Sequence, residues 1–428
     1  MLNNSIIQFG YSNLQLVYSI TEIAGEHMQP LVSATDLKNQ FEAELRGNIL
    51  PYWMEKTLDH QNGGFYGALT NLNQIHNEVE RSAVLNSRIL WTFSTAARLY
   101  QDETYLSTAK WAMQALTQHF WDPEHEGIYW SVDAAGNPVN DRKHVYAQAF
   151  SIYGLSAYYQ VTQDPQALQL AKRLFELIAQ HTYDPKYGGN IECRARDWSR
   201  LEDMRLSSID LNSSKSMNTM LHLLEAYTAL TNIWQDARLT QRFEEMISLF
   251  TNTIIDSESG HQRLFFDDQW QSLSQNISYG HDIETSWLLL EAAEASGKPE
   301  TISKAKANAV QMAQVVFEQS LQPDGSILYE AGANGHKVTD RHWWAHAEAV
   351  VGFYNAYEVS KKDHFLQAST RVWTYIQNHF VDHKDGDWFK LLSENGAPYL
   401  EHYKVSPWEC PYHHARMCFE MIRRLSAN

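Results

Sequence analysis

Apolar positions in this chain are spaced as pairs of helical segments. In one pair, the segment from about residue 143 to 158 is apolar on nearly every side, whereas the segment from 168 to 178 has one apolar and one charged face. A helix that is apolar all round is typical of a buried position, and an amphipathic helix is typical of a surface position. Each pair therefore predicts one inner and one outer helix.

This pairing repeats along the chain. The other segments of the buried type span 85–99, 216–230, 281–295, 342–357 and 412–425. A glycine turn followed by an aromatic or strand-like stretch precedes each new pair, and six copies occur at intervals of roughly 60–70 residues. An open helical solenoid needs polar capping repeats, which neither end of the sequence has. We therefore predict an all-α fold, an (α/α)6 toroid or barrel of six helical hairpins, with short β-ribbons or loops at one rim.

The first residues differ from the rest. Residues 1–27 contain no Lys or Arg and no compact apolar run, so they do not have the pattern of a signal peptide. Their helical periodicity is weak, and a better organised segment begins at Met28. We expect 1–27 to be a poorly ordered N-terminal extension and 28–428 to be a single (α/α)6-barrel catalytic domain.

Composition narrows the range of partners. The formal net charge of −17 disfavours a nucleic-acid partner, because phosphate contacts need a basic face. No apolar stretch approaches the roughly 20 residues that span a bilayer. Three cysteines, an odd number without metal-like spacing, indicate free thiols in a reducing compartment. We expect a cytoplasmic protein, a monomer or homodimer, with a small neutral ligand.

Unusual polar and aromatic residues cluster at the starts of the predicted inner helices. Since parallel inner helices of a toroid begin at one mouth, these side chains would converge there, near helix ends that favour negative charge. A single histidine at a helix start is more often a hydrogen-bonded core residue, and only the coincidence in six helices favours a site. The residues are Asn86, Arg88, Tyr146, Asn218, His222, His281, Glu284, His342, Trp343, Trp344, His346, Trp408, His413 and His414.

A metal site is one alternative reading of this set. His342 and His346 have the four-residue spacing of helical zinc ligands. The sequence has no HExxH motif, no cysteine ligand pair and no EF-hand pattern. We therefore expect no metal and no cofactor.

The residue types favour proton transfer over hydrolysis. A glycoside hydrolase needs two carboxylic acids at the scissile bond, and the helix starts offer Glu284 with Asp210 or Asp282 as further candidates. Several histidines instead suit proton abstraction beside a carbonyl, because their pKa lies near neutrality. An enediolate intermediate would need donors such as Arg88 and a third histidine. A non-enzymatic carbohydrate-binding helical repeat remains a further alternative.

From about residue 36 to the C-terminus, the chain resembles the cellobiose 2-epimerases of the N-acylglucosamine 2-epimerase superfamily. The resemblance implies cofactor-independent epimerisation at C2 of a reducing-end glucose or mannose unit, through ring opening and a cis-enediol(ate). The stretches that carry it are Leu85–Trp91, Lys143–Tyr146, Ser216–Thr219 with His222, Tyr279–Glu284, Trp343-Trp344 with Ala347–Ala349, and Pro407–His413.

The resemblance also implies roles for individual residues. His281 and His413 match the acid–base pair, and His222 matches a third essential histidine. Arg88 and Asn218 match groups that bind the open-chain sugar near C1 and C2. Glu284 is expected to orient His281, and the wall residues are Tyr146, Trp344 and Trp408.

Two positions depart from the family's usual pattern. His414-Ala415 stands where Asn-Gly is common, and His346 stands where Gln is common. Because both positions are expected close to the site, substrate choice is less well defined than the reaction. A β-1,4-linked disaccharide such as cellobiose or lactose is the first expectation. Mannose 2-epimerisation and aldose–ketose isomerisation use the same enediol and are the alternatives.

Overall fold

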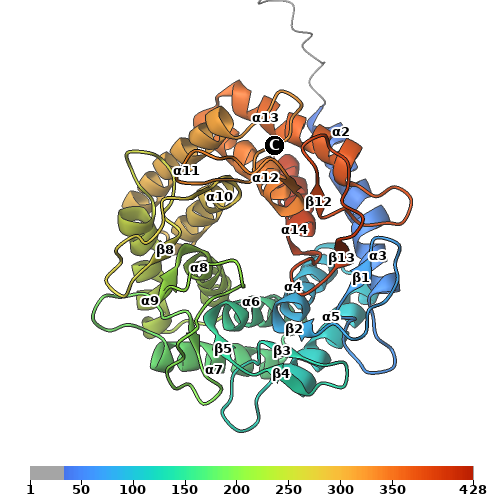
Figure 1. Ribbon diagram of the computed structural model, residues 1–428, viewed down its shortest axis with the longest axis vertical. Coiled ribbons are helices and arrows are strands. Elements are labelled where there is room, and N and C mark those ends of the chain that lie inside the picture. Colours follow the sequence, from blue (N-terminus) through green and yellow to red (C-terminus); the bar gives the residue numbers. More distant parts are fainter. Residues whose placement is uncertain (1–32, 428) are drawn as a thin grey trace, which may run out of the picture.

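Helices alternate between an inner and an outer layer of one ring in residues 33–427, the part of the chain that the computed structural model describes (Figure 1). The predicted extension over residues 1–27 lies outside the described residues. Six inner helices surround the axis: α4 (Ala83–Tyr100), α6 (Val145–Thr162), α8 (Met217–Thr231), α10 (Tyr279–Ser296), α12 (Trp343–Ser360) and α14 (Tyr412–Ser426). Their starts agree with the sequence prediction to within about two residues.

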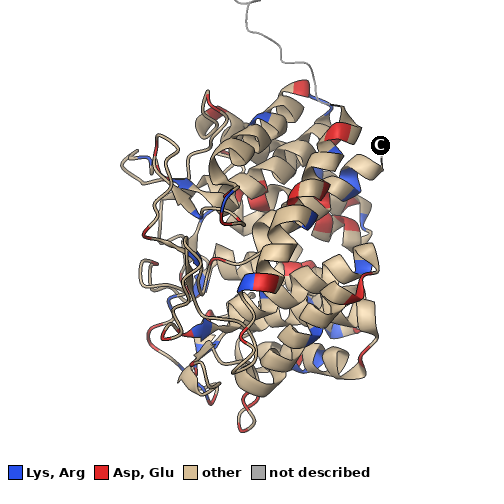
Figure 2. Cartoon of the chain, turned by 90° about the vertical axis from the view of Figure 1, so that its right-hand side faces the viewer, with Lys and Arg blue, Asp and Glu red and all other residues tan. Residues whose placement is uncertain are grey.

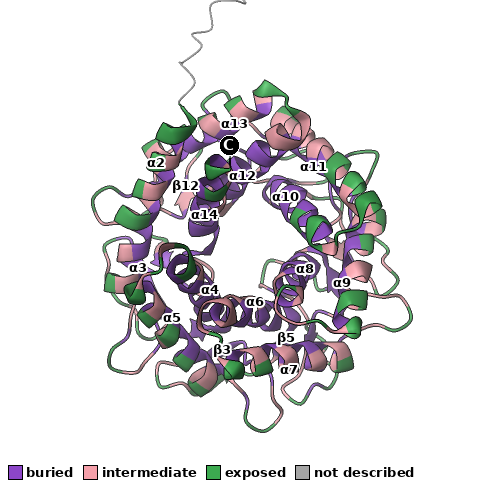
Figure 3. Ribbon diagram, turned by 180° about the vertical axis from the view of Figure 1, so that it is seen from behind, coloured by how far each residue is buried: buried purple, intermediate pink, exposed green. Residues whose placement is uncertain are grey.

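The outer layer packs against the inner helices and faces solvent. The first outer helix is continuous through α2 (Ala34–Glu44), η1 (Leu45–Ile49) and α3 (Leu50–Lys56). The others are α5 (Glu103–Ala115) with η2 (Leu116–Phe120), α7 (Pro165–His181), α9 (Ala237–Leu249) with η3 (Phe250–Ile254), α11 (Pro299–Gln319), and α13 (Asp363–Tyr375) with η4 (Ile376–Phe380). Inner helices are buried on nearly all sides, whereas outer helices are exposed along their outward faces (Figure 3). The predicted toroid is confirmed.

Short antiparallel β-ribbons link successive repeats. The strand before each inner helix pairs with the strand after the glycine turn of the next repeat. The ribbons are β2 (Arg81–Ser82) with β3 (Ser131–Val132) and β4 (Pro138–Asn140), β5 (Lys143–His144) with β6 (Cys193–Arg194), β7 (Lys215–Ser216) with β8 (Phe265–Phe266), β9 (Ile277–Ser278) with β10 (Glu330–Ala331), and β11 (Arg341–His342) with β12 (Leu391–Leu392). These loops and ribbons gather on one side of the helical ring (Figure 2). We call this side the mouth.

The ring closes by the same pairing. β13 (Tyr403–Val405), which precedes the last inner helix, pairs with β1 (Leu69–Thr70) of the first repeat. The buried Asn71 amide group beside this ribbon donates to the carbonyl oxygen of His402 at 2.7 Å. Because every ribbon immediately precedes an inner helix, all six inner helices begin at the mouth.

Buried lysines tie several glycine turns to the ribbons. Lys143 Nζ lies 3.0 Å from Asp122 Oδ2, and Lys215 Nζ lies 2.8 Å from Asp184 Oδ2. In both pairs the aspartate belongs to a glycine turn and the lysine to the strand that leads into an inner helix. Buried charges are tolerated when they are paired and hydrogen-bonded, so these pairs fix where the inner helices start.

Candidate active site

Two positions of the inner helices supply most of the side chains that meet at the mouth. They are the second and the sixth residue of the helix, which are four apart and so share one face. Side chains at these positions contact one another across helices, and we call the group the central cluster. Its members at these positions are Arg88, Tyr146, Phe150, Asn218, His222, Glu284, Trp344, Glu348 and His413.

Arg88 is buried among aromatic rings. Its Nη2 donates to the Tyr146 hydroxyl at 2.9 Å, and its Nη1 donates to Cys410 Sγ at 3.7 Å. The guanidinium lies 4.1 Å from the Phe150 ring centre and 4.8 Å from that of Tyr412. No carboxylate among the described residues pairs with Arg88. A buried cation without an acidic partner is suited to an oxygen that gains negative charge.

His222 is oriented by a carboxylate on its own helix. Its Nδ1 lies 3.0 Å from Glu225 Oε2, and its ring contacts those of Tyr146 and Phe150. Burial alone would raise the pKa of Glu225, but Arg416 and His222 lower it to about 2. Since an ionised carboxylate only accepts hydrogen bonds, Nδ1 is the donor and Nε2 is the available nitrogen.

His413 has a similar partner on a neighbouring helix. Its Nδ1 lies 2.7 Å from Glu348 Oε1, while Glu348 Oε2 accepts from Trp287 Nε1 at 3.0 Å. Burial and the charges of Arg88 and Arg416 lower the pKa of His413 well below its usual range. The ring is therefore neutral near pH 7, with Nε2 as its free nitrogen.

His281 differs from the other two histidines because its partner is a hydroxyl group. Its Nδ1 lies 2.7 Å from Ser278 Oγ, and burial lowers the pKa of His281 to about 3. The Trp344 ring contacts both predicted acid–base groups, 4.7 Å from the His281 ring and 5.4 Å from the His413 ring. A Cβ on Gly280 would lie 2.7 Å from the Trp344 ring, so a glycine here leaves the space for that tryptophan.

Glu284 does not orient His281, and that prediction is wrong. Its Oε1 accepts from Arg416 Nη2 at 2.5 Å, and within the described residues its Oε2 has no hydrogen-bond partner. Burial and the neighbouring Glu348 raise the pKa of Glu284 to about 7. The sixth position does bring Glu284 into the central cluster, but Ser278 is the group that contacts His281.

Asn218 and Trp408 complete the predicted set. Asn218 Oδ1 is buried and has no partner among the described residues. The Trp408 ring lies 6.0 Å from the Tyr146 ring and 5.8 Å from that of Trp130. Trp408 thus joins the central cluster to the loops of the mouth.

The two departures from the family's pattern lie behind the site, not beside the substrate position as expected. His346 Nε2 accepts from the backbone N–H of Ile327 at 3.0 Å, and its ring stacks on Tyr375 of the outer layer. His414 Nε2 lies 2.7 Å from Asp387 Oδ1. Both rings are fully buried, His346 against the outer layer and His414 between Trp343 and Trp388, so neither lines the cavity at the mouth.

The alternative of a zinc pair is not supported by the geometry. His346 Nδ1 hydrogen-bonds the carbonyl oxygen of His342 at 2.8 Å, so both of its ring nitrogens are engaged. Among the described residues, Glu284, Glu348 and His413 lie close enough to share an ion. The guanidinium of Arg416 already bonds both of these carboxylates.

The carboxylates named for a hydrolase have other partners. Asp282 Oδ1 accepts from the backbone of Gln262 at 3.0 Å, and Asp210 Oδ2 accepts from Ser207 on a surface loop. Asp282 and Glu284 therefore do not form a pair that flanks a bond. The arrangement fits proton transfer better than hydrolysis.

The sequence pattern did not single out Glu225, Glu348, Arg416 or Ser278 as functional residues. Glu348 stands at the sixth position of α12, as Glu284 does in α10, so the helical register could have identified it. The other three lie outside the two positions. Ser278 and Glu225 each lie three residues from the histidine that they contact, a spacing that could have identified them. Only the role of Arg416 depends on contacts between helices that the sequence does not reveal.

Comparison with known proteins agrees with this geometry. The sequence model of the N-acylglucosamine 2-epimerase family matches residues 64–416. A cellobiose 2-epimerase of Bacteroides fragilis is 43% identical over 387 residues, covering 90% of this chain and 98% of that protein. One of Dictyoglomus turgidum is 37% identical, covering 91% and 99%. The solved cellobiose 2-epimerase of Bacillus thermoamylovorans B4167 has a TM-score of 0.86 and 38% identity, covering 91% and 99%.

Family match, fold and a histidine-rich mouth lead to the same conclusion. No helix of the described residues is long and apolar enough to cross a membrane. The chain belongs to the N-acylglucosamine 2-epimerase family and is a carbohydrate 2-epimerase, an isomerase that acts on a sugar.

Proposed function

We propose that this enzyme interconverts the glucose and mannose configurations at the reducing-end C2 of a β-1,4-linked disaccharide such as cellobiose or lactose. The observation that carries the proposal is that the His281 and His413 rings, from different inner helices, both contact Trp344, at 4.7 and 5.4 Å. Inversion at carbon needs a proton to leave one face and return to the other. Two separate imidazoles provide for this.

The reaction begins with ring opening, which exposes the aldehyde at C1. One imidazole removes the proton from C2, and the electron pair of the C–H bond forms the C1–C2 double bond of a cis-enediolate. The second imidazole delivers a proton to C2 from the opposite face. No atom is gained or lost overall, and the reverse reaction exchanges the two roles.

Arg88 stabilises the negative charge of the intermediate. Arg88 has two weak acceptors, a phenol and a thiol, so its charge is available to an enediolate oxygen. His222 presents Nε2 as an acceptor, because its Nδ1 donates to Glu225, and so accepts from a sugar hydroxyl group during ring opening. Asn218 binds a hydroxyl group nearby, and Tyr146, Trp344 and Trp408 form the walls. Glu284 acts on this set through Arg416.

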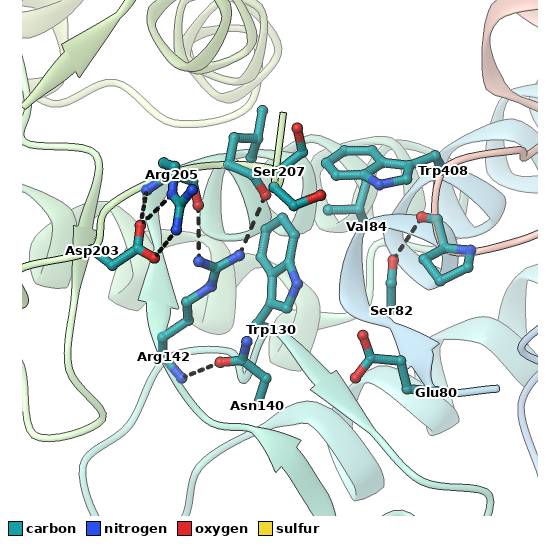
Figure 4. A pocket seen from close by; sticks show the side chains of 13 residues that line it. Glu80, Ser82, Val84, Trp130, Asn140, Arg142, Asp203, Arg205, Ser207 and Trp408 are labelled. Carbon is teal, nitrogen blue, oxygen red and sulfur yellow. Dashed lines mark hydrogen bonds and ion pairs between the residues drawn. The ribbon is translucent and has the colours of Figure 1, made fainter. Parts of the chain in front are cut away.

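A second sugar unit has room in a cavity of about 410 Å³ at the mouth (Figure 4). Val84, the second residue of α4, and Trp408 line it, so it opens from the central cluster. Trp130 and Arg142 form another side, and their side chains stack at 4.6 Å. Aromatic faces with a few polar groups suit a sugar ring.

Two further proposals concern the cellular location and the assembly state of the enzyme. Its three cysteines, Cys193, Cys410 and Cys418, are all buried and unpaired. We propose a cytoplasmic location, because reducing compartments keep such thiols free. The assembly state is proposed as a monomer or a homodimer.

Incubation in deuterated water tests the reaction and the substrate together. The protein is given cellobiose and, separately, mannose, with EDTA present, and products are followed by NMR. Deuterium at C2 of an epimerised disaccharide is the expected result. Glucose released from cellobiose would instead indicate hydrolysis, and exchange with mannose alone would overturn the disaccharide assignment.

A matched variant tests the cavity. Trp130→Ala should raise KM for cellobiose and leave the kinetics with mannose unchanged. An equal effect on both sugars would contradict the placement of the second unit.

A further inference from the structure

Arg416, which follows the predicted catalytic histidine by three residues, makes more charged contacts than any single side chain of the central cluster. Its Nη1 bonds Glu225 Oε1 at 2.5 Å. Its Nη2 bonds Glu284 Oε1 at 2.5 Å and Glu348 Oε1 at 2.7 Å. One guanidinium therefore joins carboxylates from α8, α10 and α12.

Two of these carboxylates are the partners of catalytic histidines. Glu225 holds Nδ1 of His222 through one oxygen and bonds Arg416 through the other. Glu348 holds Nδ1 of His413 and bonds Arg416 through the same oxygen. Each histidine–glutamate pair is thus connected to the other through Arg416.

The charges make this connection necessary. Three buried carboxylates would repel one another, and in a low-dielectric interior some would take up protons. A protonated Glu225 or Glu348 could donate a hydrogen bond to Nδ1, which would move the imidazole proton to Nε2. The nitrogen that faces the sugar would then be unable to accept the C2 proton.

We propose that Arg416 is the positioning residue that fixes His222 and His413 in one tautomer, so that both present an unprotonated Nε2 to the sugar. It acts through Glu225 and Glu348 and does not touch the substrate. The proposal rests on the proposed function for its kinetic consequences. Its structural content, the tautomer of two imidazoles, can be measured without any substrate.

Lysine cannot replace arginine in this arrangement. A guanidinium offers two terminal nitrogens in a fixed plane, and each here faces a different pair. A lysine ammonium is a single point of charge on a flexible chain.

The other titratable or charged groups facing this region are Arg88 on α4, Tyr153 on α6, Glu291 on α10, and Tyr412 on α14.

The first experiment compares Arg416→Lys and Arg416→Met with the wild type. We expect kcat to fall about 10²-fold or more in the methionine variant, with KM nearly unchanged. The lysine variant should lose less activity, and its kcat–pH profile should change shape. Arg423→Met is the matched control, because Arg423 lies on the same helix and pairs with Glu420 in a largely exposed position. It should behave as the wild type.

The second experiment separates charge from packing. In the double variant Arg416→Met with Glu284→Gln, one of the repelling carboxylates is removed. We expect its kcat to exceed that of Arg416→Met by about tenfold, the equivalent of one pKa unit. A packing defect alone would not be relieved, so an unchanged kcat would overturn the proposal.

The third experiment reads the tautomers directly by NMR of protein labelled with ¹⁵N-histidine. The wild type should show His222 and His413 protonated at Nδ1, and Arg416→Lys should show Nε2–H signals. Arg416→Lys with wild-type spectra and wild-type kcat would overturn the proposal, even if Arg416→Met does not fold. A wild type that exchanges C2 protons in no sugar would refute the proposed function, while the spectra would still test the role of Arg416.

Discussion

At the scale of single residues, the three histidines of the site differ in their hydrogen-bond partners. His222 and His413 have carboxylate partners, whereas His281 has the Ser278 hydroxyl. A carboxylate fixes the tautomer of an imidazole, but a hydroxyl can donate or accept. His281 can therefore exchange a proton without a change of partner.

Removal of either acid–base group should abolish most turnover. We expect His281→Ala and His413→Ala each to lower kcat about 10²–10⁴-fold, the usual contribution of general acid–base catalysis. Steady-state kinetics with cellobiose measures the loss, and circular dichroism checks that both variants fold. Near-normal turnover in either variant would contradict the assignment.

Activity should persist in mildly acidic solution. Burial lowers the pKa of His281 to about 3 and that of His413 well below its usual range. A base is lost only when the pH falls to its pKa, so the His281 ring stays neutral between pH 7 and 5, and the His413 ring stays neutral below the usual histidine range. Because the pKa of Glu284 is raised to about 7, the kcat–pH profile is measured in Glu284→Gln. It should show no histidine titration near 6.5, and an inflection there would contradict this.

Ser278 should affect catalysis more than helix capping. It is the N-cap residue of α10, but its side chain makes no capping hydrogen bond and instead contacts His281. Ser216, at the same place before α8, does cap its helix through the N–H of Thr219. Ser278→Ala should lower kcat about 2–10-fold, the equivalent of one hydrogen bond.

Ser216→Ala is the control for that prediction. It should lower the free energy of unfolding by about 1 kcal/mol through loss of the cap, with kcat retained. Equal kcat in the two variants would show that the contact between Ser278 and His281 has no kinetic role.

At the scale of the element, the fourth residue of an inner helix can hydrogen-bond the stretch that follows the preceding glycine turn. Gln148 Oε1 accepts from the backbone N–H of Ile128 at 2.8 Å, and His346 makes the equivalent bond to Ile327. In α4 the same position holds Asn86, predicted to lie at the mouth, which donates to the carbonyl oxygen of Ala112. A histidine or asparagine at a helix start can thus serve packing, and only its register distinguishes the two uses.

His346 should make the fold sensitive to acid. Burial lowers the pKa of His346 to about 3, below the value near 6.5 of an unfolded histidine. Between these values the unfolded chain binds more protons, so the free energy of unfolding falls as the pH drops through this window. His346→Gln, which copies Gln148, should therefore lose less stability than the wild type.

Denaturant unfolding at pH 7 and pH 4 measures this effect. The difference in the free energy of unfolding between the two proteins should be about 3 kcal/mol larger at pH 4 than at pH 7. Parallel losses in both proteins would contradict a neutral, buried His346.

The helices, and whether each lies in the inner or the outer layer, could be predicted because the spacing of apolar residues reflects how far a helix is buried. Ring closure could be predicted from the lack of polar ends. The convergence of Arg88, His222, His281 and His413 followed from the parallel starts of the inner helices and from resemblance. The link between Arg416 and Glu225, and that between His413 and Glu348, could not be predicted, because these residues meet only after their helices pack.

At the scale of the whole molecule, the site depends on ring closure. Arg88 lies in the first inner helix and Cys410, its sulfur partner, precedes the last one. The closing ribbon joins β1 to β13, and Trp388 Nε1 donates to Glu44 Oε1 at 2.7 Å between the outer layers. Opening of this seam would separate Arg88 from His413.

Asn71 offers a test of that dependence. Asn71→Ala removes the bond to His402 at the seam and should lower the free energy of unfolding by about 1–3 kcal/mol. Hydrogen exchange should rise together in β1 and β13, and activity should be lost at a lower temperature. Asn137→Ala, in an exposed turn, should stay within about 0.5 kcal/mol. Unchanged exchange at the seam would contradict this role for Asn71.

In the inner helices, the fourth residue serves the frame of the ring, whereas the second and sixth residues form the site. This division has an evolutionary consequence. Residues such as Gln148 and His346 hold the repeats together, while Tyr146 and Trp344, two places earlier, belong to the central cluster. Mutations can therefore alter what the ring recognises without loosening its frame, and drift in the frame, as from glutamine to histidine, leaves the chemistry intact. Each repeat thus has two separate sets of side chains, one that stabilises the fold and one that can change the specificity of the site.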